Sequence, residues 1–211
     1  MEKEEWVRIL IEAADRVYES ARNIKSEVTD LEVKALKNLL DQVAQKAIHN
    51  TLKKHAVSAK VVSEEGNYIL GNGDHTVVLD PIDGTTNLAR SLPPAVTSMA
   101  ISETGKLSGT IIGVIKDLFT GDVYHAINGE GAWHNSNPIK TASPIPFRDA
   151  LISIDLSKSP RLGKISSILE TSRHLREPGC AAMSLCYLAR GSLDVHIDVR
   201  GILRATDVNA G

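Results

Sequence analysis

The run Asp80-Pro81-Ile82-Asp83-Gly84-Thr85-Thr86-Asn87 constrains the fold and the chemistry of this chain more than any other stretch. It follows residues 76–79, a short β-branched and apolar segment that predicts a buried strand, and its proline and glycine predict a turn. Two carboxylates three residues apart at the end of a strand would repel each other if both were ionised. A hard divalent cation such as Mg²⁺, which prefers oxygen ligands, would relieve that repulsion with help from the carbonyl of Ile82.

The second half of this run, residues 84–87, predicts a phosphate site. These residues are small and offer N–H groups and hydroxyls at the point where a helix would begin. A plain turn after a strand is the alternative, and for a lone pair of Asp residues it would be the better explanation. The longer run favours a metal site and a phosphate site side by side.

A second strand also ends in carboxylates. Residues 59–63 are predicted to form a strand, and Glu64, Glu65 and Gly66 follow it. If this strand lies beside the one that ends at Asp80, then Glu64 meets Asp80 and Asp83 at the same edge of the sheet. Three clustered carboxylates without a basic residue nearby in the sequence are hard to explain as a structural feature.

The rest of the chain predicts an α+β protein. Apolar residues at helical spacing predict helices over residues 6–17 and 31–52, with a polar loop over 23–30. Asp41 lies inside the second helix, where a solvated charge is the default interpretation. Further strands, most of them in an antiparallel sheet, are predicted over 68–70, 96–102, 109–116, 121–127, 151–156 and 193–197, and further helices over 162–169 and 181–189.

Composition excludes several classes of protein. A net charge of −2 without a basic stripe argues against nucleic-acid binding. The acidic N-terminus does not resemble a signal peptide, and no apolar run approaches the roughly 20 residues that span a bilayer, so a cytoplasmic location is predicted. Cys180 and Cys186 are six residues apart and form no CxxC motif, which favours small core residues in a reducing compartment.

Four motifs, in this order and spacing, resemble the inositol monophosphatase family of Mg²⁺-dependent sugar phosphatases. They are Glu64-Glu65, the run 80–87, the turn 179–182 and the ending 207–211. The resemblance is closest to archaeal members that act on both inositol monophosphate and fructose 1,6-bisphosphate. It implies a layered sugar-phosphatase fold with two lobes, an N-terminal α+β lobe over 1–145 and a smaller α/β lobe over 146–211 that is truncated at its C-terminus. It also implies a homodimer.

The resemblance assigns a role to each matching position. Two or three Mg²⁺ ions, which Mn²⁺ can replace, would be held by Glu64, Asp80, the carbonyl of Ile82, Asp83 and Asp207, with Asp80 bridging two ions. Asp41 and Thr85 would orient the nucleophilic water together with Glu64. The amides of Gly84 and Thr85 would bind the phosphate, and Ala181, Asp198 and Arg200 would contact the substrate.

The activity implied is a Mg²⁺-dependent hydrolysis of the phosphomonoester of fructose 1,6-bisphosphate, inositol 1-phosphate or both. Asp198 and Arg200 favour a substrate with a second phosphate, since arginine binds phosphate in a bidentate manner. Nearby Arg204 is better explained as a surface charge. Two alternatives stay open: a phosphatase of 3′-phosphoadenosine 5′-phosphate, which would need an aromatic base site, and a non-catalytic protein that binds metal or phosphate.

Overall fold

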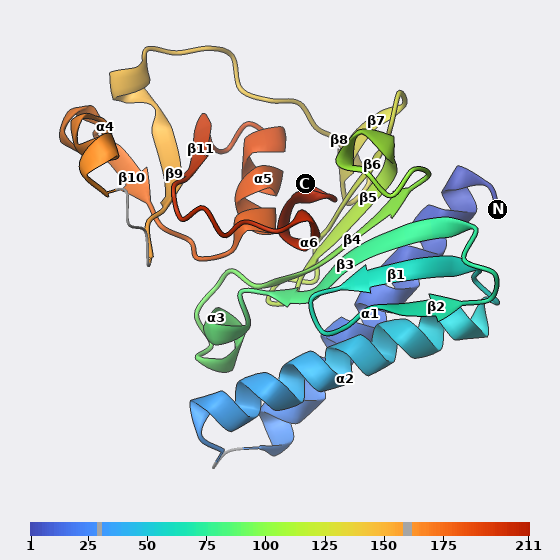
Figure 1. Cartoon of the computed structure of the whole chain (residues 1–211). Coiled ribbons are helices and arrows are strands. Elements are labelled where there is room, and N and C mark those ends of the chain that lie inside the picture. The colour runs from blue at the N-terminus through green and yellow to red at the C-terminus, as the bar shows by residue number, and fades with distance from the viewer. Residues whose placement is uncertain (29–30, 158–161) are drawn as a thin grey trace.

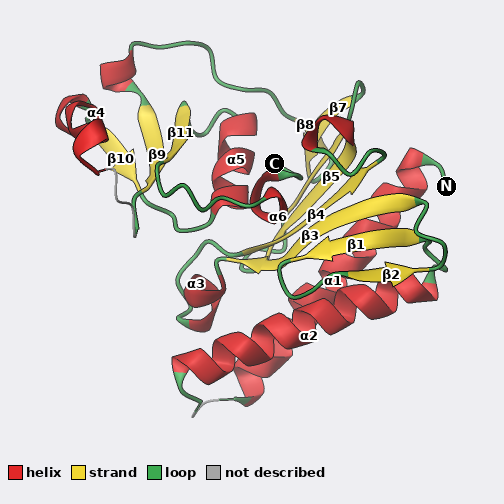
Figure 2. Cartoon of the chain, viewed as in Figure 1, coloured by secondary structure: helices red, strands yellow, loops and turns green. Residues whose placement is uncertain are grey.

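Helices and sheets alternate in layers in the computed structural model, which describes residues 1–28, 31–157 and 162–211 (Figures 1 and 2). Two long helices cover one face of a large sheet, and a shorter helix separates the other face from a small sheet (Figure 1). This arrangement confirms the predicted layered α+β fold. The division into lobes at residue 145 stays a prediction. Among the described helices, none is both long enough and apolar enough to cross a membrane.

The two long helices, α1 (Lys3–Glu27) and α2 (Val33–Lys54), form the outer layer. Their apolar residues recur at helical spacing and are buried against the sheet, including Trp6, Leu10 and Leu40. Both helices were predicted, but α1 continues through residues 23–27, where the sequence predicted a loop. The ammonium group of Lys25 stabilises this last turn by donating to the carbonyl of Leu88 at 2.7 Å. The rest of the predicted loop includes residues 29–30, which lie outside the described residues.

The large sheet has eight strands in the order β2-β1-β3-β4-β5-β6-β7-β8. Neighbouring strands are antiparallel except for β1 and β3, which are parallel. That parallel pair delivers Glu64 and Asp80 to the same edge, as predicted. The strands are β1 (Ala59–Ser63), β2 (Tyr68–Leu70), β3 (His75–Asp83), β4 (Val96–Ser102), β5 (Thr110–Asp117), β6 (Val123–Ile127), β7 (Gly131–His134) and β8 (Asn137–Pro138).

An irregularity near the end of β3 decides which way its carboxylates point. Asp80 pairs with Ser98 and Asp83 pairs with Val96, so three steps along β3 match two steps along β4. In a regular strand, residues three apart face opposite sides, but one extra residue returns them to the same side. Ile82 accordingly joins the helix-covered core, and Asp80 and Asp83 both face away from it. Pro81 is tolerated at this bulge because the ladder is already interrupted there.

The small sheet and its helices form the remaining layers. The parallel strands β9 (Leu151–Asp155), β10 (His174–Arg176) and β11 (Val195–Asp198) lie in the order β10-β9-β11. Helix α5 (Ala181–Ala189) packs Ala182, Met183 and Cys186 on the large sheet. Three short helices complete this part of the chain: α3 (Thr85–Ala89), α4 (Ser166–Thr171) and α6 (Ala205–Val208).

Candidate metal centre

Three carboxylates from three separate elements meet at the edge of the large sheet. One oxygen each from Glu64, Asp80 and Asp207 lies within 4.8 Å of the others. Asp80 is only 4% exposed. Its burial, followed by the nearby charges of Asp83 and Glu64, raises the pKa of Asp80 far above its usual value.

This cluster fits a hard divalent cation. All of its donor atoms are carboxylate oxygens, which Mg²⁺ and Mn²⁺ prefer over nitrogen and sulfur. Without a cation, the burial of Asp80 and then the neighbouring negative charges of Asp83 and Glu64 disfavour ionisation of its carboxyl, which raises its pKa. The donor set of this chain is therefore suited to such a cation.

Asp83 lies beside the cluster but is oriented by helix α5. Its Oδ2 accepts a hydrogen bond from the backbone N–H of Ala182 at 2.8 Å and lies 3.3 Å from the thiol sulfur of Cys180. Burial raises the pKa of Asp83 to about 6, although these two hydrogen bonds act in the opposite direction. The structure therefore places Asp83 in the same cavity as the three-carboxylate cluster, with one oxygen already held by protein donors.

The predicted pair of Asp41 and Thr85 is in contact across 44 residues of sequence. The hydroxyl of Thr85 lies 2.9 Å from Oδ1 of Asp41 and 2.9 Å from the carbonyl oxygen of Ile82. Burial, opposed by the hydrogen bond from Thr85, raises the pKa of Asp41 to about 6. A group with this pKa can accept or release a proton near neutral pH.

Two close approaches hold the ends of the site in place. The side-chain amide of Asn87 donates to the carbonyls of Pro94 and Pro178, at 2.9 and 2.8 Å, and so fixes the turn that precedes α5. The last residues of the chain lie directly on β5, because a side chain at Gly113 would place its Cβ 2.4 Å from the carbonyl oxygen of Ala210. Gly113 thereby allows α6 to present Asp207 to the other carboxylates.

Two basic residues that sequence reasoning did not assign to the site face its cavity. Arg204 forms an ion pair with Glu64, and its backbone N–H donates to Oδ2 of Asp207 at 2.9 Å. Lys37 lies one helical turn before Asp41 on α2 and donates to the hydroxyl of Thr86 at 2.8 Å. The spacing of Lys37 and Asp41 was the one available signal, since residues four apart share a helix face.

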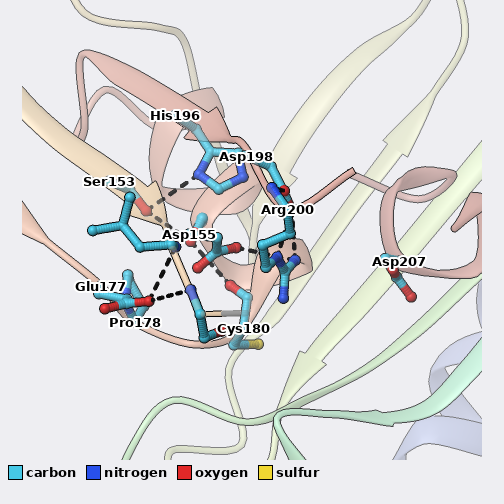
Figure 3. A network of polar contacts seen from close by, with 12 residues as sticks. Ser153, Asp155, Glu177, Pro178, Cys180, His196, Asp198, Arg200 and Asp207 are labelled. Atoms are coloured by element: carbon cyan, nitrogen blue, oxygen red, sulfur yellow. Dashed lines mark hydrogen bonds and ion pairs between the residues drawn. The ribbon is translucent and has the colours of Figure 1, made fainter. Parts of the chain in front are cut away.

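The predicted substrate residues Asp198 and Arg200 bind each other. The guanidinium of Arg200 donates to Asp198 at 2.9 Å and lies 3.4 Å from Asp155, as Figure 3 shows. Burial acts against ionisation of Asp198, but the hydrogen bonds from Arg200 hold the pKa of that carboxyl below its usual value. Arg200 lines the cavity, but its positive charge is offset by the carboxylates of Asp155 and Asp198.

The clustered carboxylates, Asp83, Thr85 and the three basic residues line one cavity of about 270 Å³, and Asp41 is linked to it through its hydrogen bond with Thr85. None of the described residues that line it is aromatic. The lining includes four acidic residues, three basic residues, residues 84–86 and Ala181 at the start of α5. The full set is Lys37, Glu64, Asp80, Ile82, Asp83, Gly84, Thr85, Thr86, Gly179, Ala181, Arg200, Ile202, Arg204 and Asp207.

Known proteins resemble this chain in sequence and in fold. The model of the inositol monophosphatase family matches residues 2–211. A protein of Thermococcus kodakarensis named fructose-1,6-bisphosphatase/inositol-1-monophosphatase is 34% identical over 172 residues, which cover 82% of this chain and 63% of that protein. Inositol monophosphatase 1 of Solanum lycopersicum is 30% identical over 206 residues, covering 91% of this chain and 74% of its own length.

A solved structure extends this likeness to the fold. The extragenic suppressor protein SuhB of Bartonella henselae superposes with a TM-score of 0.85 at 25% identity, covering 98% of this chain and 82% of that one. The match to this chain spans slightly less than two thirds of the length of the archaeal relative.

Proposed function

The chain belongs to the inositol monophosphatase family, and from this premise we propose that it hydrolyses phosphomonoesters with the help of Mg²⁺. The observation that carries the proposal is the three-carboxylate cluster of Glu64, Asp80 and Asp207, which shares a cavity with Thr85, the hydrogen-bond partner of Asp41. A cluster of acids alone would suit many cations. A proton-accepting pair at the same cavity supports catalysis rather than storage of an ion.

Glu64, Asp80, Asp207 and the carbonyl of Ile82 would hold the cations, and Asp83 would contribute the oxygen that α5 leaves accessible. Bound Mg²⁺ would supply the two effects typical of such sites: a lowered pKa of a coordinated water and stabilisation of charge on the leaving oxygen. We propose two ions as the working number. Mn²⁺ has the same preference for oxygen and would substitute.

The Thr85 hydroxyl would position the attacking water. Above a pH of about 6 Asp41 is largely ionised and accepts hydrogen bonds only. The single proton of Thr85 is then directed to Asp41 or to the Ile82 carbonyl, and the lone pairs of its oxygen are left to accept a hydrogen bond from water. Orientation of this kind contributes about 10² to 10⁴-fold to a rate.

The basic residues of the cavity would hold the phosphate groups of the substrate. We propose fructose 1,6-bisphosphate and inositol 1-phosphate as substrates, supported by the name of the archaeal relative, fructose-1,6-bisphosphatase/inositol-1-monophosphatase. Because the charge of Arg200 is offset by Asp155 and Asp198, a second phosphate would depend more on Arg204 and Lys37. Gly84 and Thr85 would bind the scissile phosphate through their amides, and Ala181 would contact the substrate at the start of α5.

The alternative substrate, 3′-phosphoadenosine 5′-phosphate, has less support. An adenine base is usually held by stacking on aromatic side chains. The described lining residues of the cavity include none.

Phosphate release from the three substrates, each with Mg²⁺ and with a chelator, tests this proposal, with Asp80→Asn as the inactive control. Chelator-sensitive release from the first two substrates supports the dual sugar phosphatase. Release from the adenosine compound alone would favour the alternative substrate. No release from any substrate despite bound metal would favour the non-catalytic binding protein.

Assembly and location are part of the same proposal. A homodimer in the cytoplasm is what the family resemblance implies, and light scattering of the purified chain would measure the first of these.

A further inference from the structure

Arg204 contacts two of the three clustered carboxylates. Its guanidinium forms an ion pair with Oε1 of Glu64, and its backbone N–H donates to Oδ2 of Asp207. The backbone N–H of Asp207 in turn donates to the carbonyl of Arg204 at 3.2 Å. The backbone contacts anchor residue 204 beside the cluster, while its side chain is 58% exposed and free to take other positions.

The other two bases of the cavity have different partners. Arg200 is held between Asp198 and Asp155, and Lys37 donates to Thr86. Within the described part of the chain, Arg204 is therefore the cavity base that is ion-paired to the three-carboxylate cluster. Its positive charge compensates one of the charges that a divalent cation would compensate.

From this contact we propose that Arg204 is a built-in counter-ion of Glu64 that couples the binding of metal to the binding of phosphate. The inference rests on the proposed function, because it takes the cluster to be the metal site. Glu64 leaves the guanidinium of Arg204 when it ligates a cation. The released guanidinium is then available to a phosphate group in the same cavity.

The coupling has a defined sign and size. An ion pair between partly exposed side chains is worth little, so its loss should change the metal affinity about two- to five-fold. Because breaking the pair opposes metal binding, removing Arg204 should strengthen Mg²⁺ binding in the absence of phosphate. By thermodynamic linkage, phosphate that binds Arg204 strengthens Mg²⁺ binding by the same factor by which Mg²⁺ strengthens phosphate binding.

Calorimetric titration of Mg²⁺ with and without inorganic phosphate tests this proposal on the wild type and on Arg204→Ala. The variant should bind Mg²⁺ about two- to five-fold more tightly without phosphate and should lose part of the enhancement by phosphate. Arg204→Lys, which keeps the charge, should restore part of the wild-type behaviour. The matched control is Arg173→Ala, which removes a similarly exposed ion pair, with Asp149, outside the cavity; it should change neither affinity.

Each alternative role of Arg204 gives a different result. If the arginine holds Glu64 ready for the metal, Arg204→Ala binds Mg²⁺ more weakly, and the proposal is wrong. If the arginine only binds phosphate, the variant has an unchanged Mg²⁺ affinity without phosphate, which also overturns it. A wild type that binds no Mg²⁺ would instead refute the metal site and the proposed function with it.

Discussion

Replacing Asp83 by Asn should make the metal-free protein more stable while it removes metal binding. The carboxylate of Asp83 is largely buried beside α5, and burial raises its pKa to about 6 from 3.8. The asparagine oxygen can still accept the hydrogen bond that the N–H of Ala182 donates at 2.8 Å. The substitution therefore removes the charge and keeps the main contact.

The size of the effect follows from this pKa difference. An acid whose pKa is raised by folding destabilises the folded state at every pH at which its charged form is populated in the unfolded chain. The penalty is absent well below pH 3.8, grows between pH 3.8 and about 6, and is constant above that. At 1.36 kcal/mol per pKa unit it reaches about 3 kcal/mol, and we expect about 1 to 3 kcal/mol after relaxation of the surroundings. In a domain of this size each kcal/mol shifts the melting temperature by about 2 to 4 °C, so the gain is about 2 to 12 °C.

Thermal unfolding in the presence of a chelator measures this gain. We expect it to be several degrees at pH 7.5 and about one third as large at pH 4.5, because at a pH only slightly above 3.8 the folded state keeps the carboxyl protonated at little cost in free energy. Saturating Mg²⁺ should stabilise the wild type and leave the variant unchanged. The matched control is Asp74→Asn, an exposed acid just before the same strand, which should show no gain. A metal-free variant that melts below the wild type at pH 7.5 would refute the reasoning.

Four further substitutions test other parts of the account. Thr85→Val removes the hydroxyl shared by Asp41 and the Ile82 carbonyl, so initial rates should show kcat reduced about 10²-fold with an unchanged melting temperature. Gly113→Ala places a Cβ against the backbone of Ala210 and so disturbs the segment that carries Asp207. Titration should show that the variant binds Mg²⁺ more weakly, by up to about 10-fold. Lys37→Met should raise the KM for a bisphosphate about 10-fold and leave kcat nearly unchanged. If kcat falls as much as KM rises, Lys37 has a structural role instead. Hydrogen bonds from Lys54 and His55 lower the pKa of Glu12 to about 2 from 4.5. Glu12→Gln should therefore destabilise the protein at pH 7, and the destabilisation should shrink as the pH falls from 4.5 toward 2. Urea unfolding at several pH values would measure this.

Most strands of the large sheet could be predicted because their sequence pattern is local. Residues 59–63, 68–70 and 96–102 form strands over the predicted ranges. The meeting of Glu64 and Asp80 also followed from two strand ends that carry carboxylates. Nothing local marked β7 and β8, which are short and rest on pairing with a neighbour.

The side chains that surround the carboxylates could not be predicted in the same way. The bulge that turns Asp83 to the same side as Asp80 depends on how β3 pairs with β4, which the sequence of β3 does not specify. The ion pair between Arg204 and Glu64 joins residues 140 positions apart, and a lone arginine is more often a surface charge. Asp207 lies inside the first turn of α6 and accepts a hydrogen bond from the N–H of Arg204, a contact that nothing local in the sequence indicates.

An anomalous difference map from crystals soaked in Mn²⁺ would test the central claim, that the clustered carboxylates form a divalent-metal site. We expect a peak bounded by oxygens of Glu64, Asp80 and Asp207, with Arg204 displaced from Glu64. A map at saturating Mn²⁺ with no peak in this cavity, and with the Arg204–Glu64 pair intact, would contradict the account.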